Sequence, residues 1–167
     1  MTRLVWISGI SGSGKSRLAD RLHQDAVVLR ADLLVNVVSP QFPVADLGTS
    51  DAQRAVVGKL RAMLAQRLPA RALVIDGRGE IGPWRDAIRR GLEALGVSIG
   101  PELVVYLSPP PALVFAQRLA RGRLDDGGLS LADVQAELRD YAPAVPGDAV
   151  KVKTIDQGVE AIRRFLE

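Results

Sequence analysis

The 167-residue sequence lacks several features, and each absence removes a class of function. It has no cysteine, which excludes disulfide bonds, zinc–thiolate sites and thiol nucleophiles. No apolar run approaches the roughly 18 residues that a membrane-spanning helix needs. Lysine is scarce, so arginine supplies most of the positive charge, and arginine suits bidentate recognition of phosphate. A coding bias toward arginine and alanine explains the same composition equally well.

Length and charge set broad limits on what the chain can be. A chain of this length predicts a single domain, residues 1–167, and 47% hydrophobic residues predict a normal globular core. The net charge of +3 is too small to require a nucleic-acid partner. No basic leader with a cleavage site is visible, so we expect a cytoplasmic protein without a membrane partner. A monomer and a homodimer both remain open.

The most informative segment is Gly9–Ser16, which reads GISGSGKS. It matches G-x-x-x-x-G-K-[ST], the phosphate-binding P-loop, in which backbone N–H groups surround a phosphate. Lys15 is expected to reach the β- and γ-phosphates of ATP, and Ser16 to bring its hydroxyl to Mg²⁺. An apolar run precedes the loop and a helical pattern follows it, as the motif requires. The predicted nucleotide-binding residues are Gly9, Ser11, Gly12, Ser13, Gly14, Lys15, Ser16 and Arg17.

Strand and helix patterns alternate along the whole chain. Short apolar runs predict strands at 4–7, 26–29, 72–75 and 103–107, with a weaker edge strand at 149–152. Helical spacing predicts helices at 51–68, 84–95, 111–121, from 130 onward, and 156–166. Ser50-Asp51-Ala52-Gln53 has the pattern of a capping box at the start of one of them. Such alternation predicts an α/β fold, a parallel sheet covered by helices on both faces.

Two aspartates follow predicted strands, where ligands bind in sheets of this kind. Asp32 is placed to accept a proton from an attacking hydroxyl, although it also fits a helix N-cap. Asp76 ends a fully apolar strand, the pattern of an acid that holds Mg²⁺, although Asp76-Gly77 also fits a plain turn. Arg78 follows directly and is a candidate contact for a substrate anion.

Two groups of arginines are further candidates. Arg118, Arg121 and Arg123 fit a lid over the γ-phosphate, where they would stabilise charge in the transition state. The alternative is a solvated helix end, where cations also complement the helix dipole. Arg54 lies on a basic helix face that is either solvated or a contact for a phosphodiester backbone. No aromatic residues interleave with that face, so it is no base-stacking platform.

Together these segments resemble the small P-loop kinases, the group of shikimate, gluconate, adenylate and polynucleotide kinases. The resemblance rests on the P-loop, on Asp32, on Ile75-Asp76-Gly77 and on the arginines after the fourth strand. It implies a three-layer α/β/α fold with five parallel strands in the order 2-3-1-4-5, ATP and Mg²⁺, and a short arginine-bearing lid at about 118–130. Asp32 is placed like the general base of polynucleotide kinases. Their substrate-gripping arginine three residues later is replaced here by Val35.

The predicted function is transfer of the γ-phosphoryl group of ATP to a hydroxyl acceptor. We favour a nucleotide or nucleic-acid hydroxyl, with a small metabolite such as a sugar acid or cyclitol as the alternative. A GTP-dependent switch is disfavoured because Asn36 is the only asparagine and no N-K-x-D motif exists. A non-catalytic nucleotide-binding module is less compatible with an intact Lys15, Ser16, Asp32 and Asp76. The assignment of the base to Asp32 rather than Asp76 is open.

Overall fold

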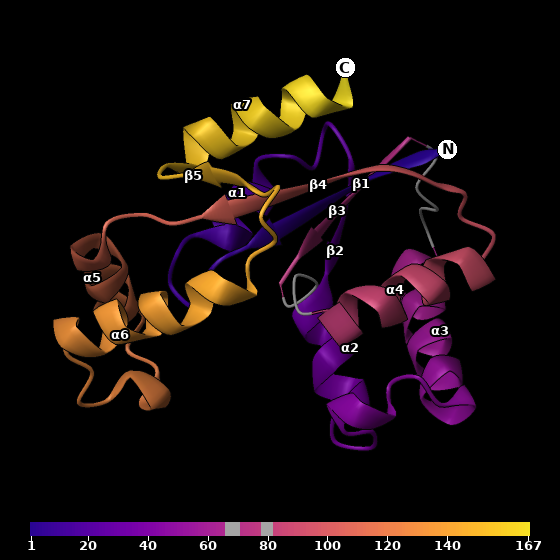
Figure 1. Ribbon diagram of the computed structural model, residues 1–167, viewed down its shortest axis with the longest axis horizontal. Helices are drawn as coiled ribbons and strands as arrows, with labels where there is room; N and C mark the ends of the chain where they lie inside the picture. The colour runs from indigo at the N-terminus through magenta and orange to yellow at the C-terminus, as the bar shows by residue number, and fades with distance from the viewer. Residues whose placement is uncertain (66–70, 78–81) are drawn as a thin grey trace.

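The fold is a parallel sheet between two layers of helices (Figure 1). The structure is a computed structural model and describes residues 1–65, 71–77 and 82–167. The strands are β1 (Thr2–Ser8), β2 (Val27–Arg30), β3 (Ala72–Asp76), β4 (Ile99–Leu107) and β5 (Val150–Val152), in the order β2-β3-β1-β4-β5. Its helices are α1 (Lys15–Asp20), α2 (Ala31–Val38), α3 (Ser50–Leu64), α4 (Gly82–Ala94), α5 (Pro111–Arg121), α6 (Leu131–Tyr141) and α7 (Ile155–Leu166), with 3₁₀ turns at Val44–Asp46, Leu124–Asp126 and Ala142–Ala144. The predicted strand order and fold class are confirmed.

The central strand β1 carries the P-loop at its carboxyl end and pairs with β3 and β4. A strand in this position is covered on both faces, which explains why it reads as an uninterrupted apolar run. β4 begins four residues before the predicted strand. Its register against β1 shifts between Thr2 and Leu4, and Pro101 lies in the shifted segment. Proline cannot donate to a ladder, so an irregular stretch is where a strand tolerates it.

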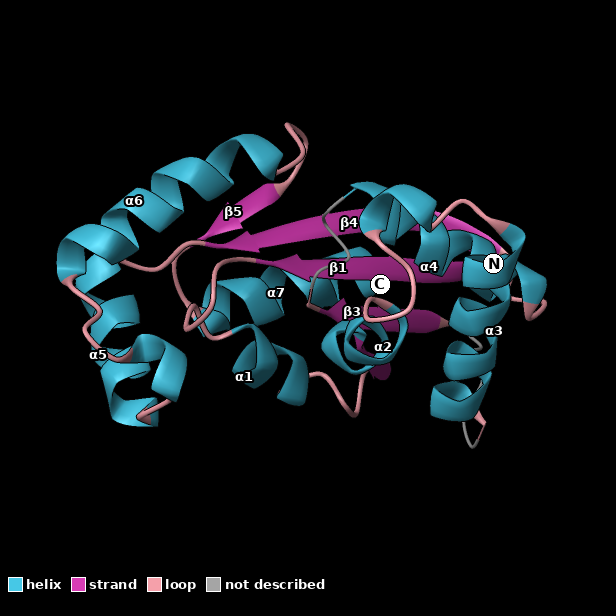
Figure 2. Ribbon diagram, turned by 90° about the horizontal axis from the view of Figure 1, so that it is seen from below, coloured by secondary structure: helices cyan, strands magenta, loops and turns pink. Residues whose placement is uncertain are grey.

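Each face of the sheet has its own apolar core. One face packs against α1 and α7 through residues such as Ile7, Leu18 and Ile162. The opposite face packs against α2, α3 and α4, and its core contains both tryptophans, Trp6 and Trp84. A smaller cluster joins the P-loop to α5 and α6. Figure 2 shows α5 and α6 together at the end of the sheet where β1 and β4 terminate.

Two helix starts show how far local sequence signals reach. Ser130 and Asp133 form a full capping box at the start of α6, and the hydrogen bonds from Ser130 lower the pKa of Asp133. The capping box predicted for Ser50 and Gln53 is wrong. Thr49 is the N-cap of α3 and accepts from the Ala52 N–H, while Gln53 donates to Leu47 O at 2.7 Å. Two adjacent residues can both cap a helix, so the sequence leaves the start ambiguous by one position.

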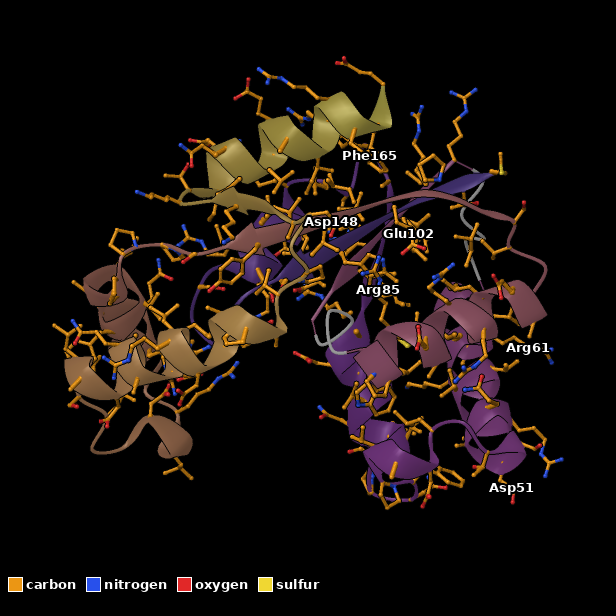
Figure 3. The ribbon with its side chains drawn as sticks, in the orientation of Figure 1. Asp51, Arg61, Arg85, Glu102, Asp148 and Phe165 are labelled. Atoms are coloured by element: carbon orange, nitrogen blue, oxygen red, sulfur yellow. The ribbon has the colours of Figure 1, made fainter. Side chains whose placement is uncertain are left out.

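A charged cluster fastens α4 to the sheet. Glu102 on β4 accepts from the Trp6 indole N–H at 2.8 Å and from Arg85 at 2.9 Å. Arg89 lies 3.1 Å from the same carboxylate, and the Arg85 guanidinium carbon lies 5.5 Å from the Trp6 ring centroid. Figure 3 shows Arg85 and Glu102 pointing toward each other between α4 and β4. The cluster satisfies one buried indole and one half-buried carboxylate at the same point.

Candidate active site

The P-loop closes tightly because three of its glycines adopt positive φ angles. Gly9, Gly12 and Gly14 have φ of 150°, 81° and 101°, conformations that L side chains rarely adopt. Gly14 is also the N-cap of α1, so the loop passes directly into the helix. The positive end of α1 therefore points toward the space that the loop surrounds, as an anion site requires.

The Lys15 side chain folds back over the P-loop. Its Nζ donates to Gly9 O at 2.6 Å and to Ile10 O at 3.0 Å. Below it, the hydroxyl of Ser13 is buried and has no hydrogen-bond partner among the described residues. A buried polar atom without a partner is costly, so the interior of the loop is prepared for a polar ligand. These observations fit the phosphates of ATP.

Ser16 and Asp76 are brought together from α1 and the end of β3. The Ser16 side chain hydrogen-bonds to Asp76, and Arg30 approaches the same carboxylate at 3.7 Å. Burial raises the pKa of Asp76, against the opposing effects of Ser16, Lys15 and Arg30. No group of three or more histidines, cysteines or carboxylates capable of holding a metal occurs in the described part of the chain. A hydroxyl and one carboxylate fit Mg²⁺, which takes its other oxygens from phosphates and water.

Asp32 lies in the first turn of α2, directly after β2. Its N-cap alternative is excluded, because Arg30 is the N-cap residue of that helix. Asp32 packs against Gly77, where an added Cβ would lie 3.0 Å from Oδ1. Gly77 has a φ of 118°, so a glycine here both permits the turn and leaves room for the carboxylate. Arg78, the predicted substrate contact, lies outside the described residues.

A cavity of about 430 Å³ opens above the P-loop. Most of the predicted site residues line it, from the loop, α1, α2 and α5: Ser11, Gly12, Gly14, Lys15, Ser16, Arg17, Asp32, Gln117, Ala120, Arg121 and Arg123. Its size is within the usual range for small-molecule sites. Gln117 and Ala120 are not among the predicted site residues. Gln117 lies four residues before Arg121, which puts these two on one helix face.

The three candidate lid arginines have different environments. Arg121 and Arg123 line the cavity, and Arg121 donates to Ser11 Oγ at 3.2 Å. Arg118 faces away and is 8% exposed, with ion pairs to Asp126 at 2.7 Å and to Glu137. Burial opposes its charge, but the two carboxylates outweigh this and raise its pKa.

Asp126 holds two of these arginines at once. Its second oxygen lies 3.1 Å from Arg121, and the hydrogen bond from Arg118 lowers the pKa of this buried carboxyl. One acid thus fixes the buried arginine and the cavity arginine in a common arrangement.

Tyr141 connects α6 to the P-loop, a contact that no local sequence pattern predicts. Its hydroxyl lies 3.0 Å from Ser8 Oγ and accepts from the Gly9 N–H at 3.3 Å. Its ring stacks on Tyr106 of β4, with ring centroids 5.9 Å apart. The first amide of the loop is therefore tied to the end of a helix more than 130 residues later in the chain.

Arg54 is not brought to this cavity. It lies on the exposed side of α3, where it forms an ion pair with Asp51. Figure 3 shows Asp51 and Arg61 on the outer side of the same helix. Arg54 does not line the cavity, so its predicted contact with substrate has no support there.

These features have counterparts in known proteins. The model of a family described as an AAA domain matches residues 4–143, a range that includes the P-loop, Asp76, α5 and α6. The chain belongs to this AAA-domain family. The predicted resemblance to the small P-loop kinases is confirmed.

The proteins that are similar to this chain in sequence or in fold include kinases. An adenylyl-sulfate kinase of Burkholderia ambifaria is 37% identical over 89 residues, which are 52% of this chain and 49% of that protein. The chain thus matches about half the length of this curated relative.

Solved structures match over nearly the whole chain. An uncharacterized protein from Eubacterium ventriosum has a TM-score of 0.55 at 13% identity, covering 99% of this chain and 98% of its own. A deoxyadenosine kinase from M. mycoides with bound products has a TM-score of 0.52 at 14% identity, covering 98% and 97%. At such identities the two structures show the common fold alone.

Proposed function

We propose that the protein transfers the γ-phosphoryl group of ATP to a hydroxyl group of a nucleoside or nucleotide. The observation that carries this proposal is the convergence on one cavity of a P-loop lysine, a carboxylate after β2 and two arginines of α5 and its exit. A phosphate-binding loop alone fits many functions. A carboxylate facing the loop across the same cavity adds a group suited to an attacking hydroxyl.

Each side chain has a role that follows from its position. Lys15 exchanges its bonds to Gly9 O and Ile10 O for phosphate oxygens, and its charge counts most as the transfer proceeds. Asp32 orients the acceptor hydroxyl and takes its proton. Arg121 and Arg123 approach the phosphates from α5 and exclude water. Ser16 and Asp76 would hold Mg²⁺, which neutralises charge on the phosphates.

The acceptor class is supported by the names of the compared proteins. Adenylyl-sulfate kinase and deoxyadenosine kinase both have nucleotide-related names, which favours a nucleoside or nucleotide over a sugar acid or cyclitol. A nucleic-acid end is the second candidate. Its support is the basic side of α3, where Lys59 and Arg61 have no ion-pair partner among the described residues, while Arg54 pairs with Asp51.

The test is an ATP-consumption screen with purified protein across nucleosides, nucleotides, oligonucleotides and sugar acids. Lys15→Ala should abolish transfer without unfolding the chain, and Arg164→Ala at an exposed position on α7 is the control that should keep full turnover. Normal turnover in a well-folded Lys15→Ala variant would rule out the proposed reaction. Turnover on sugar acids alone would retain the reaction and replace the acceptor.

Salt dependence distinguishes the nucleic-acid acceptor from a small one. Each phosphate neutralised by the protein contributes a slope of roughly −0.7 to −0.9 in log affinity against log salt. The KM for an oligonucleotide should therefore rise steeply with salt, while the KM for a nucleoside stays nearly flat. ATP is kept saturating at every salt concentration, because its own affinity also depends on salt.

A further inference from the structure

A second cavity of about 410 Å³ lies between α6 and the edge strand β5, outside the P-loop cavity. Its walls combine apolar and basic side chains. The apolar surface comes from Tyr106 and Leu138, and Ser108 adds a small polar group. Three positive charges come from Arg139, Lys151 and Lys153. Figure 2 shows α6 running alongside β5 at this end of the sheet.

The fold itself directs the three cations toward one space. Lys151 pairs in register with Tyr106, so both side chains lie on the face of the sheet that α6 covers. Lys153 lies two residues further on the same side, and its backbone N–H is fixed by the Gln157 side chain at 2.9 Å. Arg139 approaches from the third turn of α6. One lysine from β5, one from just beyond its end and one arginine from α6 therefore line the same cavity.

These cations lack the acidic partners that several other arginines have. Arg163 pairs with Asp25 and Arg85 pairs with Glu102, whereas Lys59 and Arg61 on α3 are likewise without an acid among the described residues. No ion pair joins Arg139, Lys151 or Lys153 to an acid within the ranges that the structure describes. Three like charges around one cavity repel each other, and an anion bound between them would remove that cost.

We propose that this cavity binds a phosphate-bearing small molecule, separately from the nucleotide at the P-loop. Its compact volume fits a small ligand, whereas a nucleic-acid strand needs an extended basic track. Phosphate is the anion whose charge and oxygens best match an arginine and two lysines. The proposal does not depend on the kinase reaction, because it concerns different side chains.

The cavity is also connected to the P-loop. Tyr106 in its wall stacks on Tyr141, and the Tyr141 hydroxyl accepts from the Gly9 N–H. The stacked pair Tyr106 and Tyr141 therefore connects a ligand between β5 and α6 to the P-loop. Lysines on an edge strand also protect it from pairing with other chains, and this is the competing explanation that the experiment must separate.

The experiment measures pyrophosphate binding to the intact chain by calorimetry and by amide chemical shifts. Two sites are expected. The double variant Lys151→Gln, Lys153→Gln and the single variant Arg139→Gln should each weaken one site at least about tenfold, the loss expected for a charge-assisted contact. Lys15→Ala should weaken only the other site, and Arg164→Gln at an exposed position on α7 should change neither.

Each possible result decides the proposal. The double variant Lys151→Arg, Lys153→Arg should bind pyrophosphate as the unmodified protein does, because the charge is retained. Pyrophosphate binding unchanged by the glutamine variants, with self-association of those variants, would establish edge protection and overturn the proposal. An oligonucleotide that binds the cavity more tightly than pyrophosphate would overturn its small-molecule character. If the double variant fails to fold, the exposed Arg139→Gln variant and the shifts of Ala142 and Val152 in the unmodified protein still decide it.

Discussion

Gly12 of the P-loop and the aliphatic part of Arg118 are in direct contact: a Cβ added at position 12 would lie 2.6 Å from Arg118 Cγ. The phosphate loop and helix α5 therefore fit together only because one side chain is missing. The guanidinium of Arg118 forms ion pairs with Asp126 and Glu137. The loop thus packs against an arginine that two carboxylates hold, beside the apolar contacts of Ile10 with Val114.

The contact predicts the effect of Gly12→Ala. The methyl group must displace Arg118, and φ of 81° is strained for alanine, so we expect a lower melting temperature and a large loss of ATP affinity. Gly122→Ala is the matched control. It has φ of 59° with no atom within 4 Å of an added Cβ, so it should carry strain of about 1 kcal/mol and keep ATP binding. Equal ATP affinities in the two variants would contradict the role of the contact.

The three arginines of α5 and its exit should respond differently to alanine. Breaking the buried ion pairs of Arg118 is expected to destabilise the fold by about 3–5 kcal/mol. Arg121→Ala and Arg123→Ala should leave the melting temperature nearly unchanged and lower kcat, by about 10²–10³-fold for whichever meets the charge formed in transfer. Thermal melts beside steady-state kinetics measure both. Equal, small effects that salt abolishes at all three positions would favour a solvated helix end.

Asp32→Asn should lower turnover far more than ATP affinity. Loss of a positioned base costs roughly 10²–10⁴-fold in rate, and the asparagine keeps the size of the side chain beside Gly77. Calorimetry gives the ATP affinity and steady-state assays give the rate. Asp46→Asn, an exposed change in the 3₁₀ turn before α3, is the control. If ATP binding collapses and the rate per bound enzyme stays normal, Asp76 becomes the better candidate for the base.

Asp76→Asn should make the fold more stable and the enzyme less active. Burial raises the pKa of Asp76, so the folded chain binds this proton more tightly than the unfolded chain does. The ionised carboxylate therefore costs free energy at neutral pH, and this cost disappears as the pH falls through the raised pKa.

The measurement is thermal unfolding of the unmodified protein and of Asp76→Asn, from neutral pH down through the raised pKa of Asp76. The stability gained by Asp76→Asn should be largest near pH 7 and shrink on acidification, while Mg²⁺-dependent turnover falls at least about tenfold. A variant that is less stable at every pH would contradict the proposed cost of burying this charge.

Much of the site could be predicted because its signals are local. A P-loop is defined by consecutive residues, and an acid after an apolar strand marks Asp76 as clearly as it marks Asp32. The direction of Arg118 could not be predicted, because helical spacing places it near Arg121 without saying which of the two faces the cavity. Its partner Glu137 and the contact of Tyr141 with Gly9 depend on how α6 packs. Such packing is set by tertiary contacts far apart in sequence.

The placement of the two tryptophans has a practical consequence. Trp6 and Trp84 are the only tryptophans of the chain, and both lie in the core between the sheet and α2–α4, at 1% and 2% exposure. The Trp6 indole N–H donates to the Glu102 carboxylate, and the Arg85 guanidinium lies over the indole ring. Intrinsic fluorescence is therefore a built-in optical reporter of that layer: any displacement of Arg85 or Glu102 changes the electric field on the indole and shifts its emission, whereas motion of α5 and α6 alone leaves the spectrum unchanged.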